Sequence, residues 1–284
     1  MSDRIVVGTD GSAPGTAAVE WAADDAARRG VPLRIVTVVE RRPYGIARYP
    51  APPEMADTLV EGAHRVLADA KASARRRSPD IAVAGEIVEG YPAEVLCEQA
   101  TEATEVVVGS RGLGGFVGAL VGSVSGHVAG HARGPVVVVR QGERTEHGEI
   151  VVGVDDSPEC EPALPYAFTE ALLRGAILRA VHAWQLPVHA YAPEVSYDMD
   201  DVRRAQQEAV SKKLADVAAL YPGVKLIEDV LCAHPADALI SASEKADLVV
   251  VGSHGRGGVG ALLIGSVSRA LLHHATCPVA VVRN

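Results

Sequence analysis

The strongest constraint on this chain is a glycine and serine spacing that occurs twice. Gly109-Ser-Arg-Gly112 is followed after nine residues by Gly122-Ser123, and the pattern recurs 143 residues later as Gly252-Ser-His-Gly255 followed after nine residues by Gly265-Ser266. Each copy comes directly after three consecutive valines. A strand that leads through a glycine loop into a helix turns backbone N–H groups toward an anion. The doubled pattern therefore predicts two phosphate-binding loops in one chain.

The repeat extends to the start of each half of the chain. Ile5-Val-Val-Gly-Thr-Asp-Gly-Ser12 matches Ile150-Val-Val-Gly-Val-Asp-Asp-Ser157, and both are followed by an alanine-rich segment that ends at Gly30 or Gly175. A glycine at this place suits the end of a helix. Each half is thus predicted to open as strand, helix, strand, with the second strands at 33–39 and 177–184.

The remaining segments complete the same pattern in both halves. Long helices are expected at about 54–77 and 198–220, and further strands at 81–88, 106–108 and 134–139 and at 224–231, 249–251 and 277–282. Unbroken valine runs are typical of strands buried on both faces, and parallel strands need helical crossovers. We therefore predict an α/β fold in which five parallel strands carry helices on both faces of each sheet.

Length and composition bound the domain count. A chain of 284 residues accommodates two domains of about 140 residues. We place them at 1–140 and 149–284, joined by the polar linker 141–148. Pro158, Pro162 and Pro165 crowd the start of the second domain's first helix. That helix is therefore expected to begin late or with an irregular turn.

Composition and short motifs argue against several function classes. Acidic side chains outnumber basic ones 36 to 27, which disfavours nucleic acid or a membrane surface as partner. The four cysteines show no zinc-site or disulfide spacing, and His127 and His131 have no neighbouring acid to complete a metal site. No export signal opens the sequence and no apolar run is long enough for a membrane helix. We expect a protein of the reducing cytoplasm.

These residues resemble the universal stress proteins, in the tandem form that joins two such domains. The family's nucleotide signature is glycine, two residues, glycine, nine residues, glycine and serine or threonine, and both copies match it throughout. Asp10 and Asp155 match an aspartate that nucleotide-binding members carry after the first strand. The resemblance implies two Rossmann-like domains of the adenine nucleotide alpha hydrolase type, with strand order 3-2-1-4-5. It also implies ATP at the carboxyl ends of strands one and four, where open α/β sheets bind ligands.

The resemblance assigns a set of nucleotide-binding residues to each domain. In the first domain they are Gly8, Asp10, Val38, Gly109, Ser110, Arg111, Gly112, Gly114, Gly115, Gly122, Ser123, Val124 and Ser125. In the second they are Gly153, Asp155, Ala183, Gly252, Ser253, His254, Gly255, Arg256, Gly258, Gly265, Ser266, Val267 and Ser268. Adenine is expected at the main chain of Val38 and Ala183, and phosphates at the glycine loops.

Three features of these sites stay open at the level of sequence. Asp10 and Asp155 suit ribose hydroxyls, a phosphate-bound magnesium ion, or a helix cap. Ser12 and Ser157 are expected to be caps rather than ligands. Arg111 is replaced by His254 in the second copy, where an arginine stands two residues later instead. The two sites are therefore expected to be alike in backbone and unequal in affinity.

The expected function is that of an ATP-binding regulator in stress response or dormancy, with two nucleotides per chain. Neither a Walker-type loop nor a G-x-S-x-G nucleophile occurs, so hydrolysis is expected to be slow at most. One alternative is a slow ATPase or nucleotidyl-transfer enzyme. Another is a nucleotide-free assembly module, because edge strands can pair with further strands. A homodimer of tandem chains is expected, while the protein partner and the choice among ATP, AMP and cyclic nucleotides stay open.

Overall fold

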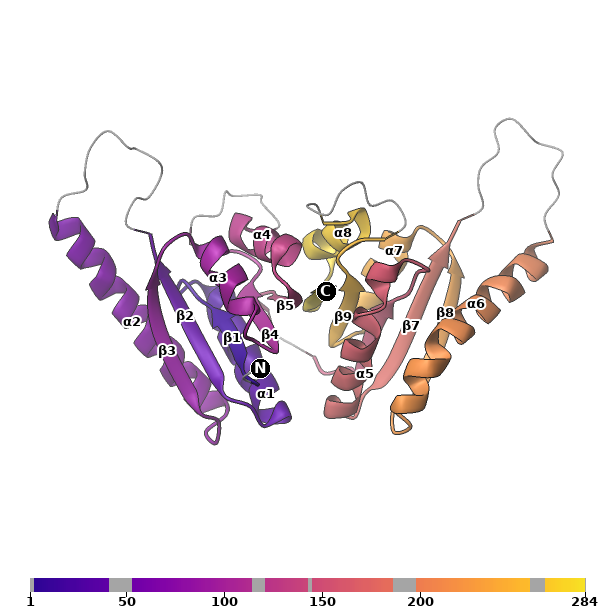
Figure 1. The fold of residues 1–284 in the computed structure, drawn as a ribbon, viewed down its shortest axis with the longest axis horizontal. Coiled ribbons are helices and arrows are strands. Elements are labelled where there is room, and N and C mark those ends of the chain that lie inside the picture. Colours follow the sequence, from indigo (N-terminus) through magenta and orange to yellow (C-terminus); the bar gives the residue numbers. More distant parts are fainter. Residues whose placement is uncertain are drawn as a thin grey trace, which may run out of the picture. The chain divides into compact units, whose positions relative to one another are not determined.

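The structure, a computed structural model, describes residues 3–40, 53–113, 121–142, 145–185, 198–255 and 264–283. The chain divides into two compact units, residues 1–143 and 144–283, which we call the first and second lobe (Figure 1). No helix in the described part of the chain is long and apolar enough to cross a membrane.

The two lobes contain the same succession of strands and helices. The first lobe has β1 (Ile5–Gly8), α1 (Ala13–Arg29), β2 (Leu33–Val39), α2 (Pro53–Arg77), β3 (Val83–Glu89), α3 (Pro92–Ala100), β4 (Glu105–Gly109), α4 (Ser123–His131) and β5 (Gly134–Val139). The second has β6 (Glu149–Gly153), a 3-10 turn η2 (Pro158–Cys160), α5 (Ala163–Arg174), β7 (Ile177–Trp184), α6 (Met199–Leu220), β8 (Leu226–Cys232), α7 (Pro235–Ser243), β9 (Leu248–Gly252), α8 (Ser266–His274) and β10 (Val279–Arg283).

Strand order in each lobe is the one that the resemblance implied. The strands run β3-β2-β1-β4-β5 in the first lobe and β8-β7-β6-β9-β10 in the second, with parallel pairing between these neighbours. The central strands pair with Val7 opposite Val107 and with Val151 opposite Val249. The predicted α/β fold with two tandem five-stranded sheets is confirmed.

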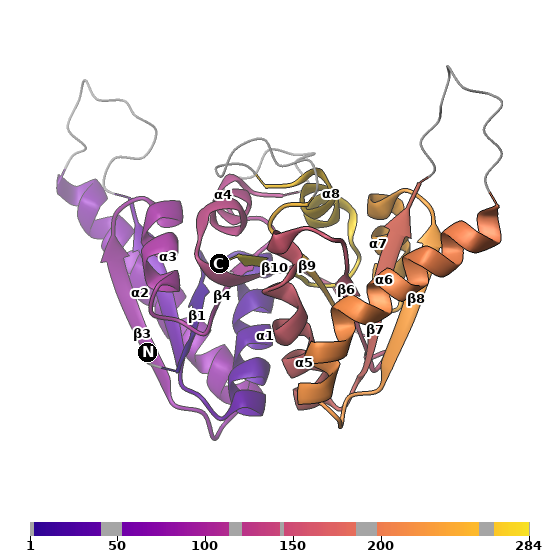
Figure 2. The same ribbon diagram turned by 45° about the vertical axis from the view of Figure 1, so that its right-hand side comes forward.

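The core of each lobe lies between this sheet and helices on both of its faces. In the first lobe α1 and α2 pack on one face, while α3 and α4 lie together on the other. In the second lobe α5 and α6 share one face, as Figure 2 shows, and α7 and α8 cover the other. The valines of β4 and β9 are essentially inaccessible to solvent. Their unbroken apolar runs therefore reflect burial on both sides.

The first helices of the two lobes start differently. In α1, Ser12 is the N-cap and its hydroxyl accepts the N–H of Gly15 at 3.2 Å. In the second lobe the chain forms the short η2 turn first, and α5 begins only at Ala163. This confirms the irregular start that the prolines predicted, because Pro162 has no N–H to donate to the carbonyl of Pro158 in a regular helix. Both helices end at a left-handed glycine, Gly30 or Gly175.

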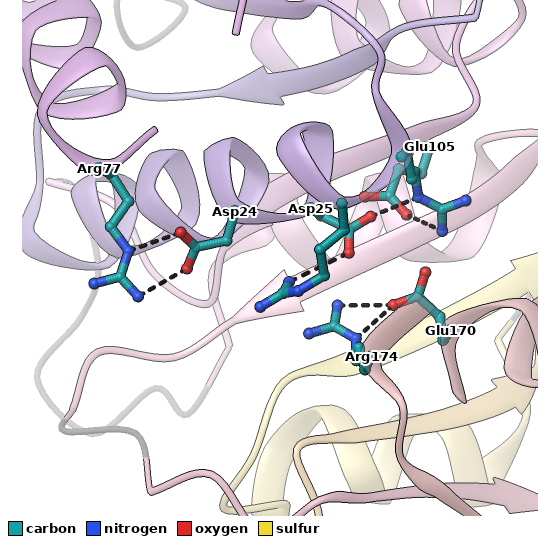
Figure 3. Close-up of polar contacts among 8 residues, drawn as sticks. Asp24, Asp25, Arg77, Glu105, Glu170 and Arg174 are labelled. Atoms are coloured by element: carbon teal, nitrogen blue, oxygen red, sulfur yellow. Dashed lines mark hydrogen bonds and ion pairs between the residues drawn. The ribbon is translucent and has the colours of Figure 1, made fainter. Parts of the chain in front are cut away.

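Acidic side chains inside each lobe are paired with arginines, which the sequence analysis did not anticipate. Arg29, in the last turn of α1, contacts Asp25 at 2.6 Å and Glu105 at 3.6 Å. In the second lobe Arg174 contacts Glu170 at 2.7 Å (Figure 3). Asp25, Glu105 and Glu170 are all buried, and a buried carboxylate requires such a partner. These ion pairs tie the end of α1 to β4 and close the last turn of α5.

Candidate functional site

The predicted site residues gather at the carboxyl ends of the two central strands of each lobe. Because β1 pairs with β4 in parallel and Gly8 lies opposite Val108, the turn after β1 and the loop after β4 leave the sheet side by side. The second lobe has the same arrangement, with Val152 opposite Val250. This is the edge of the sheet at which α/β folds bind ligands.

Some signature glycines are required by packing inside the protein. A Cβ at Gly109 would lie 2.6 Å from the carbonyl carbon of Pro14, and a Cβ at Gly252 would lie 2.3 Å from the carbonyl oxygen of Glu159. No L side chain fits at these distances. The glycine that ends each central strand thus lets the start of the first helical segment approach it.

The second signature glycine lies against the aspartate that follows the first strand of each lobe. A Cβ at Gly112 would lie 2.5 Å from Oδ2 of Asp10, and a Cβ at Gly255 would lie 2.7 Å from Oδ2 of Asp155. In each lobe the glycine loop and the aspartate carboxylate come from segments about 100 residues apart in the sequence. Their close approach forms the centre of each candidate site.

Hydrogen bonds hold the two aspartates in different ways. Asp10 accepts the N–H of Ser12 at 3.0 Å and the N–H of Leu113 at 2.7 Å, so it joins the turn after β1 to the glycine loop. Asp155 accepts the N–H of Ser157 at 3.0 Å and also the Ser157 hydroxyl at 2.5 Å. Ser157 occupies the expected N-cap position, before η2, but its hydroxyl makes no capping bond and is donated to Asp155 instead.

The third signature glycine is the N-cap of the last helix in each lobe. Gly122 precedes α4 and donates its N–H to the carbonyl of Ser110 at 2.8 Å, and Gly265 precedes α8 and donates to Ser253 at the same distance. A glycine N-cap has no side chain with which to bind the first N–H groups of the helix. These N–H groups and the positive end of the helix dipole suit an anion.

The serines of the signature fall into two groups. The hydroxyl of Ser125 donates to the carbonyl of Gly109 at 2.5 Å, and that of Ser268 donates to Gly252 at 2.7 Å. Both are buried and join the last helix to the end of the central strand. Ser123 and Ser266, at the first helical position, are exposed.

The remaining predicted residues lie around this centre or outside the described ranges. Val38 and Ala183 occupy equivalent places near the ends of β2 and β7. Arg111 is exposed, whereas His254 is half-buried with its Nδ1 at 3.0 Å from the Ser253 hydroxyl. Burial, and then the nearby Arg283, lower the pKa of His254, against an opposing effect of Glu159. The predicted residues Gly114, Gly115, Arg256 and Gly258 lie outside the described residues.

The sequence analysis missed polar residues that contact the second site from other elements. His182, on β7, lies 2.8 Å from the carbonyl oxygen of Val154 and 3.0 Å from Oε1 of Gln206 on α6. Lys213, also on α6, donates to the carbonyl oxygen of Ser157 at 3.1 Å. Spacing within a motif cannot reveal such contacts, because they join segments 24 to 56 residues apart.

Comparison with known proteins agrees with this geometry. The profile of the Universal stress protein family matches residues 1–140 and again residues 147–283. A universal stress protein of Mycobacterium tuberculosis is 37% identical, over 98% of this chain and 94% of its own length. A second relative, a universal stress protein of Mycolicibacterium smegmatis, is 36% identical, over 98% and 96%.

A solved structure has the same fold over its whole length. The crystal structure of a universal stress protein from Archaeoglobus fulgidus aligns with a TM-score of 0.72 at 20% identity and covers 100% of this chain and 99% of that one. Family profile, relatives and fold agree over both lobes. The chain belongs to the universal stress protein family, in its tandem two-domain form.

Proposed function

We propose that each lobe binds one molecule of ATP with magnesium and that the bound nucleotide regulates a response to stress. The observation that carries this proposal is the contact between loop and carboxylate, in which Gly112 lies against Asp10 and Gly255 against Asp155. A glycine loop beside an acid at the ends of two parallel strands suits a phosphate on one side and a hydroxyl or metal on the other.

The chemistry of the donor groups fits an adenine nucleotide. The N–H groups at the start of α4 and α8, behind their glycine N-caps, suit the phosphates. Asp10 and Asp155 each keep lone pairs beyond the bonds they already accept, which suits a ribose hydroxyl or a magnesium ion held by the phosphates. The main chain at Val38 and Ala183 is the proposed place of the base. These properties make the two lobes equivalent candidates.

The proposed role is retention of the nucleotide. A bound ATP would join the glycine loop, the start of the last helix and the aspartate turn, and so fix one conformation of the surface around them. We further propose that the protein acts in the cytoplasm as a homodimer of tandem chains. Size-exclusion chromatography with light scattering tests the homodimer, and a single-chain mass would contradict it.

Thermal unfolding with added nucleotide tests the proposal. A ligand that binds only the folded state raises Tm by mass action. We expect Tm to rise with ATP and magnesium, and AMP, cyclic AMP and ADP serve as comparison ligands. ADP that accumulates in proportion to the protein would identify a slow ATPase instead. A Tm that does not change at millimolar concentration of any of these nucleotides would contradict the proposal.

Paired variants show whether the effect arises at the proposed sites. Gly122→Glu combined with Gly265→Glu introduces carboxylates where phosphates are expected, and should abolish the shift. Ala82→Glu, directly before β3, and Leu220→Glu, at the last residue of α6, add the same charges at exposed positions away from the carboxyl ends of the strands. These control variants should keep the ATP-dependent rise in Tm.

A further inference from the structure

The second site receives a side-chain hydrogen bond from α6. Nζ of Lys213 donates a hydrogen bond of 3.1 Å to the carbonyl oxygen of Ser157, in the turn that carries Asp155. Figure 2 shows α6 on the same face of the second-lobe strands as α5, which follows this turn. Lys213 is partly buried, so its ammonium group is less screened than one on the open surface.

The corresponding carbonyl in the first lobe is bound within its own helix. Ser12 there accepts the N–H of Thr16 at 2.8 Å and the Thr16 hydroxyl at 3.2 Å, both in the first turn of α1. Ala70 stands at the position of α2 that corresponds to Lys213, counted from the ends of the two helices at Arg77 and Leu220. Alanine has no donor, and in the first lobe none is needed from α2.

The irregular start of the second lobe's first helical segment explains why an outside donor is used, because Glu161, four residues after Ser157, gives its N–H to the carbonyl of Pro158 at 3.2 Å. The η2 turn gives the carbonyl of Ser157 one backbone partner, the N–H of Cys160 at 3.3 Å. Regular α-helix begins only at Ala163, the first residue of α5. The ammonium of Lys213 thus takes the place of donors that α1 supplies from its first turn.

Ser157 connects Lys213 to Asp155, the candidate ligand-binding carboxylate of the second site. Ser157 binds Lys213 through its carbonyl, and binds Oδ1 of Asp155 through its N–H and its hydroxyl. The other carboxylate oxygen, Oδ2, faces Gly255 of the glycine loop. Lys213, Ser157 and Asp155 therefore form one connected path from α6 to the centre of the second site.

We propose that Lys213 is a positioning residue of the second nucleotide site, holding the Ser157 turn so that Asp155 meets the ligand in the correct orientation. The inference rests on the proposed nucleotide-binding function and adds that the two sites depend on different elements. The first site uses the first turn of α1, and the second uses the side chain of a residue on α6.

Titration calorimetry with ATP and magnesium tests this in two backgrounds. Gly122→Glu leaves the second site as the one that binds, and Gly265→Glu leaves the first. In the Gly122→Glu background, Lys213→Met keeps a side chain of similar length without its charge and should weaken ATP binding about tenfold, the lower end of the range for one lost hydrogen bond to a charged group. Lys213→Arg keeps a cationic donor and should restore the affinity to within about twofold.

A second measurement uses the protein without nucleotide. Hydrogen exchange of the Ser157 amide should be several-fold faster in Lys213→Met than in the parent and close to the parent in Lys213→Arg, because the turn loses its tie to α6. A general loss of stability would instead raise exchange throughout the second lobe.

Each result decides between the two proposals. Any of three results would overturn the role of Lys213 alone. ATP affinity could be unchanged in Lys213→Met, Lys213→Arg could fail to restore it, or the loss could be equal in the Gly265→Glu background. Failure of the Gly122→Glu parent itself to bind ATP would remove the second nucleotide site and the inference with it.

Discussion

Signature glycines at the two sites serve different physical purposes, although they look alike in the sequence. Gly109 and Gly252 admit the backbone of the helix start, whereas Gly112 and Gly255 admit a carboxylate oxygen. The sequence analysis assigned all four to the nucleotide-binding pocket, Gly112 and Gly255 at the phosphates and Gly109 and Gly252 at the floor. Spacing locates such glycines, but only coordinates show which atom comes close.

Gly109→Ala tests the packing role. Its methyl group would overlap backbone atoms of Pro14 and Gly15, which are fixed in the first turn of α1. We expect the free energy of unfolding of the first lobe to fall by about 3 kcal/mol. Urea denaturation measures it as a lower midpoint with unchanged slope. A midpoint equal to that of the parent would show that the strand end and the helix start can separate without cost.

Cys160 provides a prediction about pH. Burial raises the pKa of its thiol from the usual 9.0 to about 11. At pH 8.5 the thiolate-to-thiol ratio of the native protein is therefore about 100-fold smaller than for an unperturbed thiol. Iodoacetamide labelling followed by peptide mass spectrometry should modify the exposed Cys232 first and Cys160 far more slowly. Comparable rates at the two cysteines would contradict the burial of Cys160.

The same shift fixes the sign of a stability change. Between pH 9 and about 11 the unfolded chain has lost the Cys160 proton while the folded chain keeps it. The unfolded state thus binds fewer protons, and this thiol's contribution to stability falls as pH rises through that interval. In Cys160→Ala the free energy of unfolding should fall less steeply with pH in this range than in the parent. An equally steep fall would contradict the raised pKa of Cys160.

At the scale of elements, the sequence predicted most of the fold because its signals are local and repeated. Valine runs, glycine helix ends and the crowded prolines before α5 each act within a few residues, and the repeat allowed each to be checked against its partner. Strand ends shifted by one or two residues, as for β3 and β8. The contacts of Arg29 with Glu105 and of Lys213 with Ser157 join distant segments, and no local pattern encodes them.

The last helices, α4 and α8, offer a test of helix propensity. Both have nine residues, but Gly126 in α4 corresponds to Arg269 in α8. The nearest atom to a Cβ at Gly126, beyond its own helix, would be in Val121 at 3.9 Å. Gly126→Ala should therefore raise the stability of the first lobe by about 0.5–1 kcal/mol, seen as a higher Tm without nucleotide. A lower Tm would show that α4 requires the flexibility of glycine.

At the scale of the whole molecule, one backbone frame occurs twice with different polar groups around it. Asp10 is held by backbone N–H groups, while Asp155 is held partly by a hydroxyl and, through Ser157, by Lys213. Arg111 has a permanent charge, whereas burial lowers the pKa of His254 and so disfavours the charged form of its ring. The two proposed sites should therefore bind ATP with unequal affinity, which a two-site calorimetric isotherm would resolve.

Native mass spectrometry with ATP and magnesium tests the central proposal most directly, because it counts the nucleotides bound to each chain. We expect two per chain in the parent, one in Gly122→Glu or in Gly265→Glu, and none in the double variant, while Ala82→Glu and Leu220→Glu retain two. A parent chain that binds no nucleotide, or a double variant that still binds two, would contradict the assignment of an ATP site to each lobe.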